Sequence, residues 1–143
     1  ATARAAVEAA GSSVGVDDQL ADSFLCNAVQ HPHHFDIILC PNLIGDFVSD
    51  MAGGLIGSLG LCGSANVGDN HALFEAAHGS APDIAGQSKA NPISMTLSGA
   101  LLLRQIGEIG AANSLEKAIE KTVANKNTTS DLGGNRTTND CAQ

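Results

Sequence analysis

The alternation of apolar and polar stretches along the chain predicts helices separated by short strands. Residues 1–10 are rich in alanine and predict a helix that stops at Gly11. Residues 14–16 predict a short strand. Asp17 and Asp18 stand where the N-cap and the first-turn acid of a second helix belong, and His31-Pro32 ends that helix near Gln30.

The next two segments differ in their hydrophobic pattern. Residues 35–40 form a short apolar run bounded by breakers, which is typical of a buried strand in a parallel sheet. A helical pattern then runs from about Ile44 to Leu59. It contains Gly53, Gly54, Gly57 and Gly60, and each glycine lowers helix propensity by about 1 kcal/mol relative to alanine. Close helix–helix packing across a dimer interface explains these glycines better than a phosphate-binding role.

The second half predicts a strand at residues 72–75, a loop at 79–86 and a helix at 93–106 that begins after an Asn91-Pro92 cap. Ser114 is expected to open a last amphipathic helix, and the chain from Asn125 is polar and irregular. Alternating strands and helices imply an α/β fold in which helices are layered on a partial sheet. The predicted strands are few, so either the sheet is small or its remaining strands lie outside this chain.

Composition narrows the possible functions. The 143 residues include 7 Lys and Arg against 15 Asp and Glu, for a net charge of −8, which argues against nucleic acid as a partner. No apolar run approaches the roughly 20 residues of a membrane span, and no signal peptide opens the chain. The four cysteines lack CxxC spacing, which indicates reduced thiols in a reducing compartment. The chain starts at Ala1 without an initiator methionine, so we expect a processed, cloned or truncated terminus.

Two carboxylates are candidates for metal binding. Asp46 and Asp50 are four residues apart in the helical pattern and therefore project from one face of the expected helix. They are either a solvated acidic helix start or oxygen ligands for a hard cation such as Mg²⁺ or Mn²⁺. The spacing alone leaves both interpretations open.

The sequence around these carboxylates favours the metal. Asn42-Leu-Ile-Gly-Asp46-Phe-Val-Ser-Asp50 resembles the signature of the isocitrate and isopropylmalate dehydrogenases, although Ile44 stands where that family usually has Tyr, Phe or Asn. Asp22, which lies 24 residues before Asp46, resembles the third metal carboxylate of the family. The resemblance implies that Asp46 and Asp50 bind Mg²⁺ or Mn²⁺ in one subunit of a homodimer, while Asp22 serves the site of the partner.

The same resemblance sets expectations for the fold. It implies an isocitrate/isopropylmalate dehydrogenase-like fold with a non-Rossmann cofactor site. Residues 1–56 would be part of the small domain, which carries the dimerisation surface and the metal site, and residues 57–143 part of the large cofactor-binding domain.

The second candidate site is the loop from Leu73 to Pro92. By itself it is a stretch of small residues whose N–H groups could hold an anion, and the chain has no GxGxxG after a strand. The loop resembles the cofactor loop of the same family. That resemblance implies that His78 and Asn91 contact the adenine and that Asp83 accepts hydrogen bonds from the ribose hydroxyls. The full set of cofactor-binding residues expected on this resemblance is Glu75, His78, Gly79, Ser80, Ala81, Asp83, Ile84 and Asn91.

The resemblance also favours NAD over NADP. NADP-using relatives tend to carry a Lys-Tyr pair where this chain has Asp83-Ile84, and a carboxylate at that place repels a 2′-phosphate. Residues 129–131 and Gly134 likewise lack the Tyr and Arg that hold the phosphate in NADP enzymes.

The implied reaction is oxidation of a 2-hydroxy acid that bears a 3-carboxyl group, followed by loss of CO₂. Residues 66–69 and 72–76 favour isocitrate, and isopropylmalate and homoisocitrate remain alternatives, as do a non-catalytic regulatory subunit and a fragment without its own function. The catalytic Lys and Tyr and the Arg cluster of the family lie upstream of this sequence, so we expect this polypeptide alone to be inactive. The expected location is the cytoplasm, or the mitochondrial matrix in a eukaryote.

Three histidines stand outside these two sites. His31, His33 and His34 cluster beside Pro32, and such a cluster can bind Zn²⁺. No Cys or acidic residue lies at ligand spacing, so solvated loop histidines are the favoured interpretation.

Overall fold

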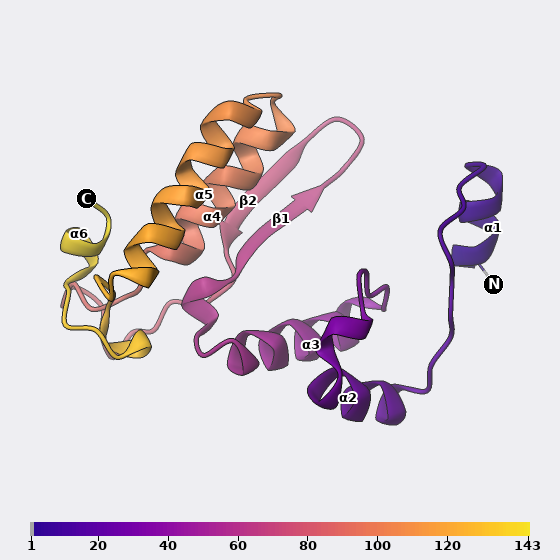
Figure 1. Ribbon diagram of the computed structural model, residues 1–143, viewed down its shortest axis with the longest axis horizontal. Helices are drawn as coiled ribbons and strands as arrows, with labels where there is room; N and C mark the ends of the chain where they lie inside the picture. The colour runs from indigo at the N-terminus through magenta and orange to yellow at the C-terminus, as the bar shows by residue number, and fades with distance from the viewer. Residues whose placement is uncertain (1) are drawn as a thin grey trace. The chain divides into compact units, whose positions relative to one another are not determined.

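The computed structural model describes residues 2–143, and its fold is α/β, with helices layered on a small sheet (Figure 1). The helices are α1 (Thr2–Ala9), α2 (Ala21–Gln30), α3 (Asn42–Leu55), α4 (Ile93–Gln105), α5 (Ile109–Ala124) and α6 (Thr138–Cys141), and the strands are β1 (Gly63–Val67) and β2 (Ala72–Ala76). Short 3₁₀ turns are η1 (Pro32–His34), η2 (Leu59–Leu61) and η3 (Ser130–Leu132). The contacts divide the chain into two compact units, Ala1–Cys40 and Pro41–Gln143. The expected domain boundary after residue 56 stays a prediction.

The first unit begins with the predicted alanine-rich helix. α1 ends as expected before Gly11, which adopts the left-handed φ of +62° and donates its N–H to the Glu8 carbonyl at 3.0 Å. The second helix was expected to be capped by Asp17 and Asp18, and this expectation is wrong because α2 starts only at Ala21. Asp18 instead accepts a hydrogen bond from Arg4 at 2.8 Å, and residues 17–20 form no helix.

The two strands expected in the first unit are absent from the described residues. Residues 14–16 and 35–40 have no strand assignment, and Ile37 and Leu39 are 84% and 79% exposed. The ring of Phe35 packs edge-on against Phe24 with centroids 5.2 Å apart, which anchors the start of the second segment. A strand requires a hydrogen-bonded neighbour, and nothing within residues 2–143 supplies one.

α3 is shorter than the glycine-containing helix predicted from Ile44 to Leu59. It starts at Asn42 and ends at Leu55, and Gly57 follows with a φ of +107° that residues with side chains rarely adopt. A Cβ on Gly53 would lie 2.6 Å from the Leu59 side chain, whereas Gly54 has open space around it. Close approach within the chain, between α3 and η2, therefore explains the glycine at 53.

The sheet is a hairpin. β1 and β2 pair antiparallel from Gly63 opposite Ala76 to Val67 opposite Ala72, so the expectation of parallel strands is wrong for the described residues. The strand predicted at residues 72–75 is confirmed as β2, while β1 was not predicted. α4 contacts both strands and α5, and so lies between the hairpin and α5 (Figure 1).

Two buried serines join α4 to the hairpin. Ser98 accepts a hydrogen bond from the Ser64 N–H at 3.1 Å and donates its own to the Glu75 carbonyl at 2.6 Å. Ser94 accepts from the Ala77 N–H at 3.1 Å and donates to the Cys62 carbonyl at 2.5 Å. Both serines are 0% exposed. α4 is therefore fixed by polar contacts on its inner face, and it is less completely buried than its apolar sequence predicted, since Met95 is 54% exposed.

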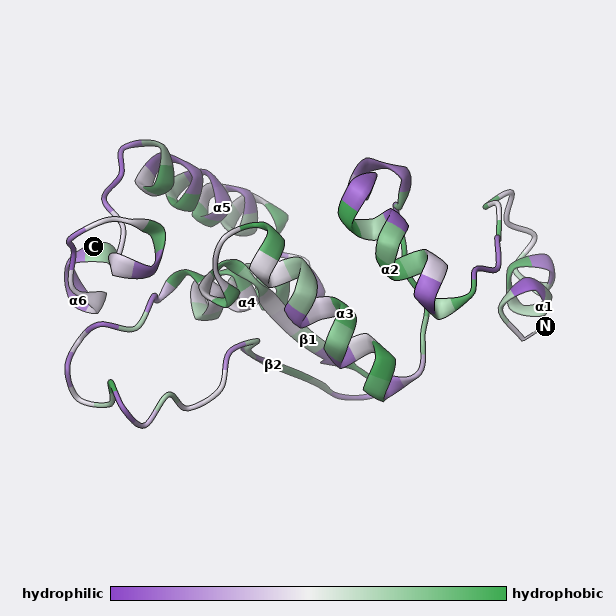
Figure 2. Cartoon of the chain, turned by 90° about the horizontal axis from the view of Figure 1, so that it is seen from below, coloured by the Kyte–Doolittle hydropathy of each residue, from purple (hydrophilic) through white to green (hydrophobic). Residues whose placement is uncertain are grey.

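The last part of the chain is more regular than predicted. α5 starts at Ile109 and not at Ser114, whose hydroxyl donates to the Gly110 carbonyl inside the helix at 2.9 Å. Figure 2 shows a hydrophilic side and a hydrophobic side on α5, and Arg104 on α4 pairs with Glu116 across the helix contact. No helix among residues 2–143 is long and apolar enough to cross a membrane.

Candidate cofactor and metal site

Asp46 and Asp50 lie one turn apart on α3, and both are exposed. Among the described residues neither carboxylate has an ion-pair partner, because the ion pairs there join Arg4 to Asp18 and Arg104 to Glu116. Burial first, and then the negative charge of Asp50, raise the pKa of the Cys62 thiol. Two carboxylates without a cation provide oxygen ligands that fit a hard divalent ion.

Asp22, the third predicted metal ligand, belongs to the first compact unit. It is exposed in the first turn of α2, where its carboxylate accepts a hydrogen bond from the Ser23 N–H at 2.7 Å. Residues 2–143 contain no group of three or more His, Cys, Asp or Glu side chains that could hold a metal ion. The role of each aspartate in metal binding stays a prediction.

The histidine cluster does form at the surface. His31, His33 and His34 are exposed, and the rings of His33 and His34 lie 4.3 Å apart between centroids. The three rings pack against one another, and they do not form a metal-holding group with the other described residues.

The predicted cofactor loop encloses a pocket of about 300 Å³. The loop connects β2 to α4, and three of its residues, Ala81, Gly86 and Ser88, have positive φ values of 41°, 74° and 51°. Five predicted cofactor residues line the pocket, namely His78, Gly79, Ser80, Ala81 and Ile84. The remaining lining residues are Ala85, Gly86, Ser88, Lys89, Ala90, Thr138 and Asn139, so the pocket wall contains one lysine and no carboxylate.

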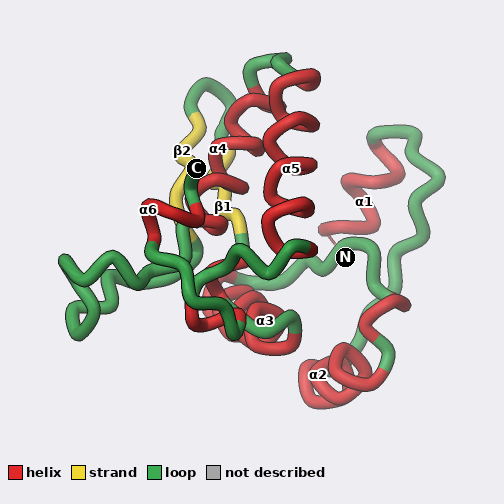
Figure 3. Tube along the Cα trace, turned by 60° about the vertical axis from the view of Figure 1, so that its left-hand side comes forward, coloured by secondary structure: helices red, strands yellow, loops and turns green. Residues whose placement is uncertain are grey.

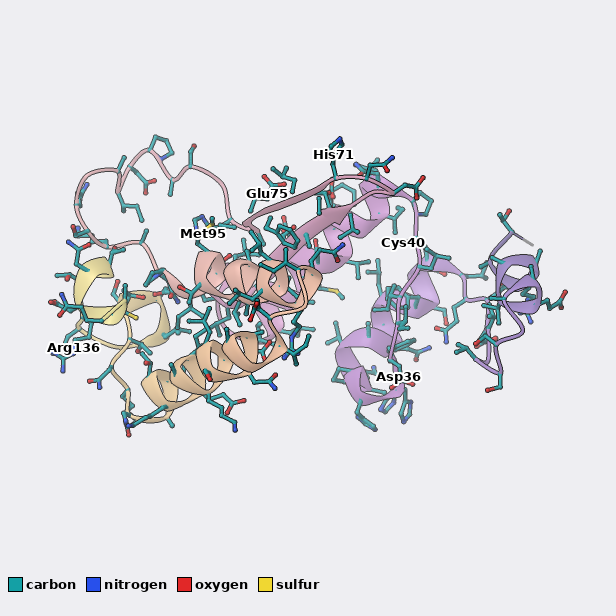
Figure 4. The ribbon with its side chains drawn as sticks, turned by 90° about the horizontal axis from the view of Figure 1, so that it is seen from above. Asp36, Cys40, His71, Glu75, Met95 and Arg136 are labelled. Carbon is teal, nitrogen blue, oxygen red and sulfur yellow. The ribbon has the colours of Figure 1, made fainter. Side chains whose placement is uncertain are left out.

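Three predicted cofactor residues do not line this pocket. Glu75 lies on β2 near the start of the loop, as Figure 4 shows, and accepts a hydrogen bond from Asn66 across the hairpin at 3.0 Å. Asp83 is exposed in the loop, and its backbone carbonyl accepts a hydrogen bond from Gln87 at 2.7 Å. Asn91 is only 7% exposed, and it performs the capping predicted for it by accepting the Ile93 N–H at 3.0 Å.

Asp131 is the central acceptor behind the loop. Its carboxylate accepts hydrogen bonds from Asn91 at 2.9 Å, from Ser58 at 2.5 Å and from Thr129 at 2.5 Å. Partial burial raises the pKa of Asp131, but the hydrogen bonds from Ser58, Thr129 and Asn91 outweigh it and hold that pKa below its usual value. The carboxylate thereby joins the start of η2, the residues before α4 and η3. Both polar ends of the Asn91 side chain are occupied within the protein.

Sequence reasoning missed the contribution of α6 to the pocket. Thr138 and Asn139 line it, and Thr138 is hydrogen-bonded to the loop through both its N–H and its hydroxyl. Figure 3 shows α6 beside the end of the loop that leads to α4. The signal that could have revealed this element is the capping box formed by Thr137 and Asp140, in which each side chain accepts a hydrogen bond from the backbone N–H of the other residue.

Gly134 follows η3 and makes the tightest approach of any glycine in the described residues. A Cβ at this position would overlap the Thr128 carbonyl, and the Gly134 N–H donates to the Thr129 carbonyl at 3.0 Å. The backbone at this point leaves no room for a side chain.

The fold and these two sites match one family of dehydrogenases. The sequence profile described as isocitrate/isopropylmalate dehydrogenase matches residues 2–143. The chain belongs to this family, whose members are oxidative decarboxylating dehydrogenases. The resemblance first read from residues 42–50 and 73–92 is therefore confirmed.

Similar proteins come from archaea, bacteria and eukaryotes. A homoisocitrate dehydrogenase of Methanocaldococcus jannaschii is 48% identical over 90% of the chain and 37% of its own length. Subunit 2 of the mitochondrial NAD isocitrate dehydrogenase of Kluyveromyces lactis is 47% identical over 87% of the chain and 35% of its own length. The apo structure of a beta-decarboxylating dehydrogenase from Thermococcus kodakarensis is 43% identical, has a TM-score of 0.86 and is matched over 96% of this chain and 40% of that one.

The chain spans less than two-fifths of the length of the curated relatives it matches, with shares between 35% and 39%. The relatives also carry different substrate names, because homoisocitrate, 3-isopropylmalate and isocitrate dehydrogenases all match at similar identity. Membership of the family is shared by all of them, and the substrate is not.

Proposed function

We propose that the chain is the C-terminal part of a metal-dependent dehydrogenase that oxidises and decarboxylates isocitrate to 2-oxoglutarate, with NAD as the hydride acceptor. The observation that carries this proposal is the family match across residues 2–143 in a chain that keeps both the carboxylates of α3 and the cofactor loop. The upstream Lys, Tyr and Arg of the full-length protein would complete the active site.

In this proposal Asp46 and Asp50 hold Mg²⁺ or Mn²⁺ together with Asp22 of a second copy of the chain. The exposed carboxylates of Asp46 and Asp50 have no protein cation to displace, and the i, i+4 spacing directs both from one face of α3. When bound, the cation would supply Lewis-acid polarisation of the hydroxyl and carboxylate oxygens of the substrate. The protein would therefore act as a homodimer or a higher oligomer.

The cofactor would be bound by the loop that follows β2. The pocket lining offers small residues and Lys89 without any carboxylate, which suits a ligand that carries phosphate. Asp83 lies outside the lining, on the exposed part of the loop, where it would accept hydrogen bonds from ribose hydroxyls and repel a 2′-phosphate. The Asn91 side chain is already held by Asp131 and Ile93, so a contact between Asn91 and the adenine would use its second amide N–H, its second oxygen lone pair or its backbone.

The choice of isocitrate rests on residues 66–69 and 72–76 and on relatives with that name, such as the Kluyveromyces lactis subunit. Homoisocitrate and isopropylmalate are the alternatives that the names of other relatives support. We place the protein in the cytoplasm, or in the mitochondrial matrix of a eukaryote, because the Kluyveromyces lactis relative is a mitochondrial protein. Neither nucleic acid nor a membrane is a proposed partner.

A regulatory subunit is a second candidate function. A mitochondrial NAD isocitrate dehydrogenase regulatory subunit of Dictyostelium discoideum is 45% identical over 86% of the chain. The catalytic role is favoured because all three candidate metal carboxylates are present in this sequence.

The test uses the full-length protein and measures kcat/KM for isocitrate, homoisocitrate and isopropylmalate with NAD and with NADP, in Mg²⁺ and after chelation. We expect isocitrate with NAD to be the best pair. Asp46→Asn should lower kcat/KM at least about a hundredfold, because a catalytic metal contributes several kcal/mol. Glu120→Gln, which removes the charge of an exposed carboxylate on α5, is the matched control and should have no effect.

A different experimental outcome would contradict each part of the proposal. Preference for NADP over NAD contradicts the cofactor assignment, and preference for another hydroxy acid contradicts the substrate. An Asp46→Asn enzyme with normal activity contradicts the metal assignment, and a full-length protein that binds NAD without turnover supports the regulatory role. A steady-state rate from the purified 143-residue chain contradicts the expectation that it is inactive alone.

A further inference from the structure

We propose that Thr138 is a positioning residue for the cofactor, which acts by fixing the shape of the loop that forms the pocket. This inference rests on the proposed function, because it takes the pocket lined by residues 78–90 as the NAD site. It concerns a residue of the C-terminal segment that neither the loop motif nor the metal signature includes.

Thr138 holds the loop at two points. Its backbone N–H donates to the Ser88 carbonyl at 2.8 Å, and its hydroxyl donates to the Ala90 carbonyl at 2.6 Å. The two carbonyls lie on either side of Lys89, so one threonine fixes three consecutive residues of the pocket wall. These contacts join segments 48 to 50 residues apart in the sequence.

The loop needs such an external support. Ser88 adopts a φ of 51°, in the left-handed region that residues with a Cβ rarely occupy. Local hydrogen bonds of the loop, such as the one from the Gln87 N–H to the Ile84 carbonyl, end just before this residue. The bond from Thr138 to Ser88 therefore stabilises a backbone conformation that the local sequence disfavours.

Thr138 is itself held in place before any ligand binds. Thr137 accepts a hydrogen bond from the Asp140 N–H at 3.2 Å and donates its hydroxyl to the Asp140 carboxylate at 2.7 Å. Cys141 at the end of α6 is buried, which fixes the other end of this short helix. The donors of Thr138 are thus presented to the loop by a turn that has its own support.

A positioning role differs from an electrostatic one. Thr138 is uncharged, so its loss should weaken cofactor binding through the geometry of the loop and not through attraction of phosphate. The effect should consequently be the same at low and high salt, whereas removal of the Lys89 charge should weaken binding more at low salt. Loss of the Thr138 hydroxyl should also raise KM for NAD and leave kcat unchanged, since Thr138 makes no contact that the reaction itself alters.

The experiment compares Thr138→Val and Thr138→Ser in the full-length protein. Valine keeps the shape and the backbone N–H but removes the hydroxyl, and serine retains the hydroxyl. Thr122→Val on α5 is the matched control, because Thr122 also donates its hydroxyl to a backbone carbonyl, that of Ala118 at 2.9 Å, and does not line the pocket. The measurements are KM and kcat for NAD, and the Kd of ADP-ribose by calorimetry at two salt concentrations.

We expect Thr138→Val to raise both the KM for NAD and the Kd of ADP-ribose about fivefold, which is the effect of one lost hydrogen bond at an exposed position. Thr138→Ser should stay within about twofold of the wild type, and Thr122→Val should bind as the wild type does. Unchanged ADP-ribose binding in Thr138→Val overturns the inference, as does an equal loss in Thr122→Val or a loss confined to kcat.

The outcomes separate this inference from the proposed function. If the protein oxidises isocitrate with NAD but Thr138→Val binds ADP-ribose as tightly as the wild type, the proposed function stands and the role of Thr138 is overturned. A protein that oxidises none of the three hydroxy acids, yet binds ADP-ribose in a manner that depends on the Thr138 hydroxyl, keeps the role of Thr138 and overturns the function. Absence of ADP-ribose binding in the wild type overturns both.

Discussion

The two compact units of this chain differ in how completely their side chains are buried and hydrogen-bonded within the chain. In residues 41–143 the helix α4 is fixed to the hairpin by two fully buried serines, and Asp131 gathers three hydrogen bonds behind the cofactor loop. In residues 2–40 Ala28 is the one buried hydrophobic residue of the described part. Leu20, Ile37 and Leu39 of that unit are between 77% and 84% exposed.

The difference shows which segments are explained by contacts within this chain and which need a neighbour from elsewhere in the full-length protein. The buried polar side chains of the second unit, such as Ser94, Ser98 and Asn91, find their hydrogen-bond partners within the unit, so the structure around the cofactor loop is defined by contacts that are present. The apolar segment at residues 35–40 has the composition of a buried strand and no neighbour among the described residues. Since the chain covers 35% to 39% of the length of its relatives, we expect the remaining length of the full protein to provide that neighbour.

Amide hydrogen exchange gives the largest expected contrast between the units. In the 143-residue chain the amides of α4 should exchange on the order of a thousandfold more slowly than those of residues 35–40, because only α4 is packed between two other elements. In the full-length protein residues 35–40 should become protected as well. Equal protection of α4 and residues 35–40 in the 143-residue chain would contradict the proposed difference between the two units.

Substitution of two glycines tests how rigid the backbone of the second unit is. Gly134→Ala should lower the free energy of unfolding by about 3 kcal/mol, because the new methyl group overlaps the Thr128 carbonyl and the backbone must shift. Gly99→Ala is the control inside α4, where no atom lies within 4 Å of the added Cβ, and it should raise stability by up to about 1 kcal/mol. Urea unfolding of both variants measures the difference, and similar midpoints would show that residues 128–134 are not rigid.

The acid response of Asp131 is the smallest expected effect. Its pKa is lower in the folded protein than the ordinary value of 3.8, so folding favours the charged form. The resulting stability is fully present above pH 3.8 and is lost as the pH falls through the folded pKa. Asp131→Asn should therefore be less stable than the wild type at pH 6, and the gap should narrow below pH 3.8 in unfolding curves measured at each pH. A gap that is constant with pH would mean that the carboxylate contributes only as a neutral hydrogen-bond acceptor.

The sequence predicted elements whose signals are local. The Asn91-Pro92 cap located α4 within a residue, and Gly11 located the end of α1. The strand β1 was missed because Gly63-Ser-Ala-Asn-Val67 is small and polar, and it is a strand only because β2 pairs with it. Residues 35–40 were misassigned for the opposite reason, since their composition suits a strand and the partner is not present among the described residues.

The candidate site was predictable to a similar degree. The motif at residues 78–84 brought five residues to one pocket, because a continuous loop folds around its own backbone. Thr138 and Asn139 reach the same pocket from about 50 residues away, and only the short capping box at Thr137 and Asp140 announces their helix. Asn91 shows where prediction from the sequence stops. The family resemblance suggested that its side chain contacts the cofactor, whereas in the structure this side chain is hydrogen-bonded to Asp131 and Ile93, which the sequence pattern could not predict.

The crowded backbone at Gly134 has a consequence for how this protein could evolve. No residue with a side chain fits at position 134 without displacing Thr128. A lineage that gained a basic residue at position 134 would first lose stability and would recover it only after residues 128–134 had been rebuilt.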